Sequence, residues 1–332
     1  MKKNSLLYLF MFLCFVLPVF QMYGIDLYLS PIFEYRNARL GEYVVIPESF
    51  SYTGKDWVLS DLQWQANTIF NLGAEAGLDF RNISFFTKAL FGLPGEVGSM
   101  TDEDFILFHM EEYDGNDVKV KPEYIYSKSN IHLDSFYNFL LGFSWNPSLS
   151  FEKNSFGLGT SFEWRSMQLT STGGIQYMYL HDGEKVSGVE VPLSGKGITY
   201  KQNMFLWWLD ASFSLGLTKK LTADFIFSYS PFWYGEAYDR HHLRNENGSS
   251  GLDFLDIVKA SSAYKIEADF LCGIKRNELG LSLSYSFIPM KTGMSGSKSA
   301  EEENYVVFKD SLGGISLSEF SASIFYRFHF AF

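Results

Sequence analysis

The chain has 332 residues, of which 46% are hydrophobic and 18% aromatic, and its formal net charge is −11. So acidic a chain argues against nucleic acid as a partner and favours cationic partners, although a simply solvated acidic surface has the same charge. The chain has two cysteines, Cys14 and Cys272. Because Cys14 lies in an apolar N-terminal run, no disulfide is expected in the mature chain.

The first residues have the pattern of a secretory signal peptide. Met1-Lys2-Lys3 is followed by an apolar run from Leu6 to Phe20, which is too short and too early for a spanning helix. Removal of residues 1–24 leaves 25 basic against 38 acidic residues, a net charge of −13. We expect residues 25–332 to form a single outer-membrane β-barrel domain.

The remaining chain alternates with a period of two. Residues 205–217 and 279–287 alternate large apolar side chains with Ser, Gly and Asp, and residues 320–332 end the chain on an aromatic strand. A face of small polar residues is a poor soluble core, but it suits the interior of a membrane barrel whose apolar face contacts lipid. A soluble two-sheet sandwich is the alternative, and the signal peptide and the terminal aromatic strand favour the membrane barrel.

Ten segments carry this pattern and predict an all-β fold, a ten-stranded antiparallel transmembrane β-barrel with long extracellular loops. The expected strands lie near residues 26–46, 56–78, 83–97, 132–146, 155–170, 199–217, 222–236, 259–274, 279–291 and 315–332. Short polar turns join them at one end. The connections at the other end are long and polar, at 47–55, 98–131, 171–198, 237–258 and 292–314.

Two of the long connections carry paired proton-handling side chains. Asp102 and Asp104 are two residues apart, as are Asp239 and His241. On an extended strand this spacing places both members of a pair on one face. If the two strand ends face each other across a cleft, the four side chains predict a hydrolase site. His241 would take a proton from water, Asp239 would fix the imidazole, and the Asp102–Asp104 pair would position the water.

Each pair also has a simpler interpretation. Residues 102–104 by themselves are an ordinary solvated acidic loop, and His242 competes with His241 for the role of base. No metal is expected, because no third and fourth ligand stand at a ligand spacing.

The strand that precedes Asp239 raises a question of phase. In residues 223–233 the odd-numbered side chains have the lipid-facing pattern, yet Asp239 and His241 are also odd-numbered. They face the interior only if the strand is bulged or ends first, and Gly235 is the candidate for that break.

The segments Met100-Thr101-Asp102-Glu103-Asp104-Phe105 and Asp239-Arg240-His241 resemble the Asp-x-Asp and Asp-x-His motifs of the omptins, ten-stranded outer-membrane endopeptidases. Further likeness lies in Gly41-Glu42-Tyr43-Val44, Ser60-Asp61-Leu62-Gln63-Trp64 and Tyr200-Lys201-Gln202. The resemblance implies an aspartyl endopeptidase of the cell outer membrane, with its groove facing outside, no covalent intermediate and no metal. It implies that Asp102, Asp104, Asp239 and His241 are the catalytic residues.

The resemblance also implies polypeptide substrates and a pocket in which two acidic residues hold a basic side chain. Glu42 matches the first of these residues. Ala237 stands at the second position, where the family has an acid. Glu236, beside it on the opposite strand face, is the substrate-binding residue expected in its place. This departure implies weaker discrimination for cationic substrates.

Glu163 and Arg165 resemble part of the family's lipopolysaccharide-binding motif, which lies on the outside of the barrel. Ser161 and Asn203 depart from that motif, and an interfacial pair without lipid specificity is the alternative. The resemblance implies outer-membrane lipid as a partner and no cofactor, and leaves open a dependence on bound lipopolysaccharide.

Two other functions fit the same barrel. A catalytically inactive surface barrel that acts as an adhesin or binding protein is favoured by Ala237. A transport barrel is the second, but ten strands enclose an interior that side chains largely fill, so a wide pore is not expected.

Overall fold

The computed structural model shows a chain built of β-strands. It describes residues 25–49, 56–105, 112–114, 117–119, 122–147, 154–182, 185–242, 251–299, 302 and 304–331. Within these ranges no helix is long and apolar enough to cross a membrane. The predicted signal peptide, residues 1–24, lies outside the described residues.

Thirteen antiparallel strands form one sheet, and β5 (Glu112–Asp114) pairs separately with β6 (Asp117–Lys119). The strands of the large sheet are β1 (Ile25–Ile46), β2 (Trp57–Phe80), β3 (Ile83–Gly92), β4 (Gly95–Phe105), β7 (Pro122–Trp145), β8 (Asn154–Asp182), β9 (Lys185–Gly216), β10 (Leu221–His241), β11 (Leu252–Ala260), β12 (Ala263–Ile274), β13 (Asn277–Ser299), β14 (Val306–Val307) and β15 (Leu312–Ala331).

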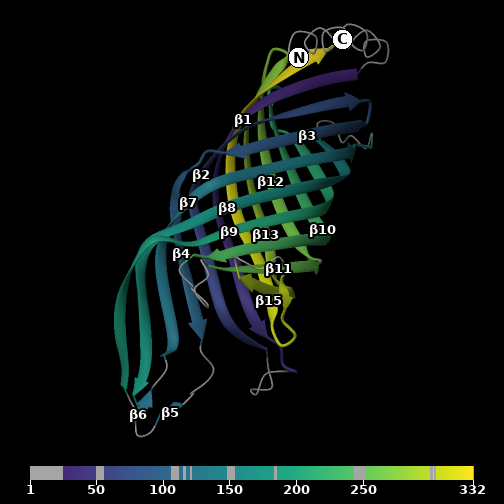
Figure 1. The fold of residues 1–332 in the computed structure, drawn as a ribbon. Helices are drawn as coiled ribbons and strands as arrows, with labels where there is room; N and C mark the ends of the chain where they lie inside the picture. Colours follow the sequence, from purple (N-terminus) through teal and green to yellow (C-terminus); the bar gives the residue numbers. More distant parts are fainter. Residues whose placement is uncertain are drawn as a thin grey trace, which may run out of the picture.

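The large sheet closes on itself. β1 pairs with β2 on one side and with β15 on the other, so the order of strands returns to its start. β3 and β4 share one place between β2 and β7, and β11 and β12 share one between β10 and β13. The ring therefore has ten strand positions, and the predicted ten-stranded antiparallel barrel is confirmed (Figure 1).

Several strands are longer than the sequence predicts. β8 and β9 continue as a paired ribbon through most of residues 171–198, which were expected to be a loop. β4 and the start of β7 likewise pair within residues 98–131. In Figure 1 these strands project from the end of the ring opposite to the one where β1 begins and β15 ends. We call the projecting end the rim.

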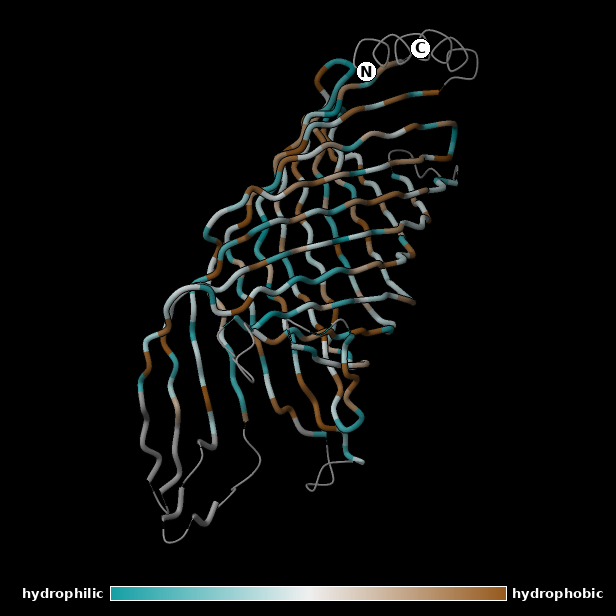
Figure 2. The backbone as a smooth tube through the Cα atoms, viewed as in Figure 1, coloured by the Kyte–Doolittle hydropathy of each residue, from teal (hydrophilic) through white to brown (hydrophobic). Residues whose placement is uncertain are grey.

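Away from the rim, the outer face of the ring is apolar. On β9, Phe205, Trp207 and Leu209 are exposed, while the even-numbered residues between them are buried. Figure 2 shows brown and teal residues alternating along the strands of the barrel wall. Exposed apolar side chains on other strands include Leu29, Phe33, Phe70, Leu72, Phe139, Leu141, Phe162, Phe227, Leu281, Ile324 and Phe328. A closed sheet with such an outer surface is a membrane-spanning barrel.

The alternation of β10 changes phase at a β-bulge. Tyr229 is 41% exposed and Ser230 is buried, yet beyond them Phe232 is 52% exposed and Trp233 is buried. The pairing of β10 with β9 shifts register between Tyr229 and Phe232, which places the bulge at Ser230 and Pro231. Proline has no amide hydrogen to donate to a ladder, so a bulge accommodates it. The predicted break therefore exists, but at Pro231 and not at Gly235.

A chain of ion pairs crosses the interior of the ring. Arg36 on β1 pairs with Glu34 at 2.8 Å and with Glu319 on β15 at 2.7 Å. Arg165 on β8 pairs with Glu163 at 2.6 Å and with Glu319 at 2.8 Å. All five side chains are buried. Because β8 and β15 lie on opposite sides of the ring, the Arg165–Glu319 pair spans the interior.

The predicted place of Glu163 and Arg165 on the outside of the barrel is therefore wrong. Both are 4% exposed, and Glu163 also accepts hydrogen bonds from Asn138 and from the indole of Trp208. Phe162, which is 59% exposed, has the outward position on β8. The motif match is one residue out of phase with the alternation of the strand, so these residues do not form the predicted lipid site.

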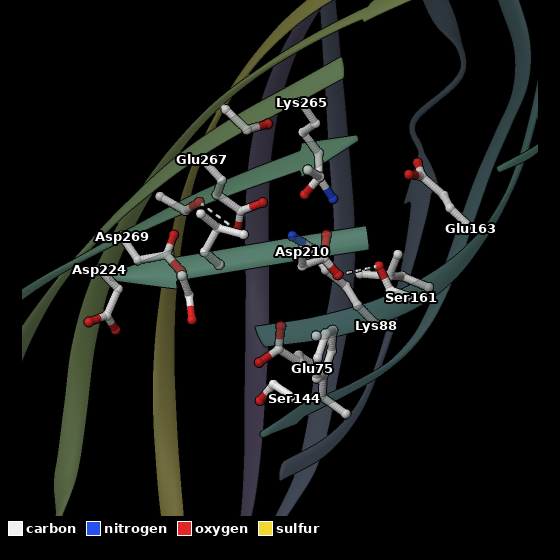
Figure 3. A pocket seen from close by; sticks show the side chains of 18 of the residues that line it. Glu75, Lys88, Ser144, Ser161, Glu163, Asp210, Asp224, Lys265, Glu267 and Asp269 are labelled. Atoms are coloured by element: carbon white, nitrogen blue, oxygen red, sulfur yellow. Dashed lines mark hydrogen bonds between the residues drawn. The ribbon is translucent and has the colours of Figure 1, made fainter. Parts of the chain in front are cut away.

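The ion pairs border a cavity of about 380 Å³ inside the barrel. Figure 3 looks into it, and its lining includes Lys88, Lys265, Glu267 and Asp269 from several strands. Side chains of both charges line the cavity, which is therefore a polar barrel interior rather than an apolar ligand pocket.

Candidate active site

Asp239 and His241 lie on the inner face of β10 near the rim. The bulge at Pro231 places the odd-numbered residues that follow it inside the ring, and Asp239 and His241 are 3% and 7% exposed. Nε2 of His241 lies 2.5 Å from Oδ2 of Asp239. The ring of Phe254 on β11 packs edge-on against the imidazole, with centroids 5.2 Å apart. The two predicted residues thus form a buried, hydrogen-bonded pair.

Asp102 and Asp104 lie on β4, at the same end of the ring. They share a strand face with Met100, which is 2% exposed and packs among the buried hydrophobic residues of the barrel interior. A register shift between Glu96 and Gly98 sets this phase. Only glycine fits at position 98, because a Cβ there would lie 2.0 Å from the carbonyl oxygen of Gln65. Both aspartates therefore face the interior, as predicted.

Glu42 connects the two pairs. It lies on the inner face of β1, opposite Leu62 on β2 and Ile315 on β15, and is 4% exposed. It stands nine residues beyond Phe33 of the apolar outer surface, roughly 30 Å along the strand, so it lies outside the membrane-spanning part. Burial raises the pKa of Glu42 well above its usual value, and the charges of Asp239, Asp256 and Asp102 raise it further. β1, β4, β10 and β11 thus bring their carboxylates to one place.

Glu236 is not part of this cluster. It lies on the outer face of β10, where it accepts hydrogen bonds from the hydroxyl groups of Tyr234 and Tyr238. The prediction that Glu236 binds substrate is wrong, because a strand neighbour of the buried Ala237 points to the opposite side of the sheet.

His242 is also separate from the site. Its Nε2 lies 2.9 Å from Oγ1 of Thr199, and its backbone N–H donates to the carbonyl of Gly197 at 2.8 Å. These contacts attach it to β9, whereas His241 bonds to Asp239. Of the two histidines, His241 is therefore the one that bonds to Asp239, at the Asp-x-His spacing.

Two inner-face residues beside these carboxylates, Asp256 and Tyr200, were not among the predicted site residues, although Tyr200 lies in a segment that resembles the family. Asp256 on β11 is 2% exposed and stands opposite Ala237. Tyr200 on β9 is fully buried and stacks on Trp64 of β2 at 5.2 Å and 12°. Burial raises the pKa of Tyr200, and the charges of Glu42, Asp256 and Asp239 add to this shift. Alternation along one strand identifies the residues that share a face with His241, but Asp256 lies on a different strand and is not found in this way.

The model of the omptin family matches residues 48–330. The chain belongs to the omptin family. Among solved structures, this omptin is similar to the outer membrane protease OmpT from Escherichia coli, with a TM-score of 0.74 and 15% identity over 92% of this chain and 97% of that chain. It also matches the P. putida toluene transporter TodX over 93% of this chain and 91% of that chain, with a TM-score of 0.28 and 8% identity.

No curated protein sequence significantly matches this omptin. At 15% identity the likeness to OmpT shows the fold, and the family model shows membership. Together they support an outer-membrane location and a protease.

Proposed function

We propose that this omptin is an outer-membrane endopeptidase that hydrolyses peptide bonds at the acidic cluster of the rim, which faces the outside of the cell. The observation that carries the proposal is the buried 2.5 Å contact between Asp239 and His241, on the inner face that Asp102 and Asp104 share. This arrangement combines a base, the group that orients it, and two further carboxylates that bind water.

His241 acts as the general base. Because Nε2 bonds to Asp239, Nδ1 is the nitrogen that accepts a proton from the attacking water. The negative charge of Asp239 stabilises the imidazolium that results and holds the ring in one orientation.

Asp102 and Asp104 position the water for attack on the carbonyl carbon. The water oxygen forms the new C–O bond, and its proton passes to His241. When the C–N bond breaks, His241 returns this proton to the leaving amine, so the products are a carboxylic acid and an amine. Polypeptides are the substrates, and the buried acidic cluster favours cationic ones.

The test is cleavage of a quenched-fluorescent peptide library by the refolded protein, with and without lipopolysaccharide. The wild type is expected to cleave, and the His241→Ala and Asp102→Ala variants to lose about 10²-fold or more of kcat. His242→Ala is the matched control, because its side chain bonds to Thr199 outside the site.

The two lipid conditions test whether cleavage depends on bound lipopolysaccharide. If the folded wild type cleaves no peptide in either condition, the barrel is instead a surface binding protein. If His241→Ala cleaves as fast as the wild type, the assignment of the base is wrong.

A further inference from the structure

Three acidic side chains from three strands lie close together on the inner face near the rim. Asp239 bonds to His241, whereas Glu42 and Asp256 have no ion-pair partner among the described residues. Glu42, Asp239 and Asp256 are 4%, 3% and 2% exposed. In the described part of the chain, the charges that act on Glu42 are those of Asp239, Asp256 and Asp102, and all of them are negative. Buried charges are normally paired, so such a cluster attracts a cation from outside the chain.

Two carboxylate oxygens of this cluster are available to such a cation. Oε2 of Glu42 and Oδ1 of Asp239 are buried and have no hydrogen-bond partner among the described residues. In the same residues no three His, Cys, Asp or Glu side chains are placed to hold a metal ion. A guanidinium or ammonium group on a substrate side chain carries several N–H donors that could bond to these acceptor oxygens.

Asp256 is directed from β11 toward Glu42. It stands opposite Ala237 on β10 and opposite Ser295 on β13, so it shares their inner face. A Cβ on Gly313 of β15 would lie 2.0 Å from Cγ of Asp256, so the carboxyl group occupies the space over this glycine. β15 is the neighbour of β1, where Glu42 stands opposite Ile315. Asp256 thus reaches past β13 toward the strand pair that holds Glu42.

Ala237 has no carboxylate, so the acidic group at this cross-strand position of β10 and β11 is that of Asp256. The two residues are cross-strand partners, whose Cβ atoms lie about 5 Å apart in an antiparallel pair. A carboxylate on either one would therefore reach nearly the same point. The stacked rings of Trp64 and Tyr200 lie beside the cluster and provide an apolar surface for the aliphatic stem of a long basic side chain.

We propose that Asp256, together with Glu42, binds the cationic side chain of the substrate residue at the cleaved bond. The proposal rests on the peptidase function above and makes Asp256 a specificity residue supplied by β11, in place of an acid at position 237. Ala237 then does not remove the preference for arginine or lysine.

The test compares two peptides that differ only at the cleaved bond, one with arginine and one with norleucine. Asp256→Asn should lower kcat/KM for the arginine peptide at least tenfold, mainly through KM, and leave the norleucine peptide within about twofold. Asp253→Asn is the matched control, because Asp253 is on the same strand and pairs with the exposed Arg240. Folding of each variant is checked by circular dichroism.

A relocated carboxylate makes the test specific. The preference is the ratio of kcat/KM for the arginine peptide to that for the norleucine peptide. The double variant Ala237→Asp/Asp256→Ala should recover at least half of the lost preference on a logarithmic scale, because position 237 on the partner strand now carries the carboxylate. An unchanged preference in Asp256→Asn, or a double variant no better than Asp256→Ala alone, would overturn the proposal.

Binding separates this inference from the peptidase function. The affinity of a fluorescent arginine peptide with a reduced, uncleavable bond is measured by anisotropy for the wild type and for Asp256→Asn. A loss of affinity in the variant supports the role of Asp256 even if the wild type cleaves nothing. Equal affinities count against it even if the wild type is an active peptidase.

Discussion

Arg165 on β8 and Glu319 on β15 form a 2.8 Å ion pair across the interior of the barrel. Both side chains are 5% exposed, and each has a second partner, Glu163 for Arg165 and Arg36 for Glu319. The pair thus joins opposite walls of the ring through a continuous chain of charges.

Removal of one cation from this chain is expected to destabilise the barrel. Arg165→Met removes the positive charge that pairs with the buried carboxylates of Glu163 and Glu319. The free energy of unfolding should fall by about 3–5 kcal/mol. Arg165→Met/Glu163→Gln removes both charges of a pair and should recover most of this loss. Urea titration followed by tryptophan fluorescence measures both, with Arg39→Met at the exposed rim as control. A double variant as unstable as Arg165→Met would contradict the electrostatic explanation.

Asp239 is expected to affect the rate and not the binding of substrate. Asp239→Asn removes the negative charge that stabilises imidazolium at His241, so kcat should fall about 10²-fold or more while KM changes little. Steady-state kinetics on one good peptide give both constants. A large rise in KM with an unchanged kcat would instead place Asp239 in the substrate pocket.

The acidic cluster should make the protein less stable as the pH rises. Burial raises the pKa of Asp256 to about 7, with a further contribution from Asp239, whereas an unfolded aspartate ionises near pH 4. Between these values the folded state holds more protons than the unfolded state, so stability present below about pH 4 is lost toward about pH 7. Each pKa unit corresponds to roughly 1.4 kcal/mol.

Asp256→Asn removes this titration. Its melting temperature in detergent should equal that of the wild type near pH 4 and exceed it near pH 8, and Asp253→Asn should show no such divergence. Parallel curves for the wild type and Asp256→Asn would show that Asp256 is ionised in the folded protein throughout.

Gly313 and Asp256 are expected to be coupled. Gly313→Ala places a methyl group 2.0 Å from Cγ of Asp256, so the carboxylate must move. We expect a loss of about 1–3 kcal/mol in stability and a weaker preference for arginine peptides. Gly95→Ala, where a Cβ meets nothing within 4 Å, is the control.

The coupling is measured by adding Asp256→Ala to Gly313→Ala. Because the clash then disappears, the double variant should lose less stability than the sum of the two single variants. Additive losses would mean that the glycine acts on another group.

The period-two alternation predicted the fold well, and its errors have local causes. All ten strand positions appear, because apolar and small polar residues alternate throughout the membrane-spanning part. The predicted strands were shorter than the observed ones. β8 and β9 continue beyond their predicted ends as a paired ribbon, in which the alternation of apolar and small polar residues fades. The bulge was placed at Gly235 and not at Pro231, since both residue types interrupt a strand and the sequence does not show which pairing shifts.

The site was partly predictable. Two short motifs indicated Asp239, His241, Asp102 and Asp104, whose inward orientation the structure shows, and their catalytic roles remain proposals. The misplaced residues stand on the wrong face of their strands. Glu163 was assigned by likeness to a motif, and Glu236 because it is the sequence neighbour of Ala237. Each is one residue out of phase with the face that its role required. Asp256 was missed because its relation to Ala237 exists only across the β10–β11 ladder.

The stacked rings of Trp64 and Tyr200 and the ion-pair chain of Arg36, Glu319 and Arg165 cross the same interior from different walls. Among the described residues, these contacts place side chains across the interior, where a polypeptide would have to pass. If the rim holds the proposed peptidase site, a substrate protein must present a loop or an end from the side on which the rim stands, and both fragments depart on that same side. The proposed reaction then takes place at the membrane without moving the substrate across it.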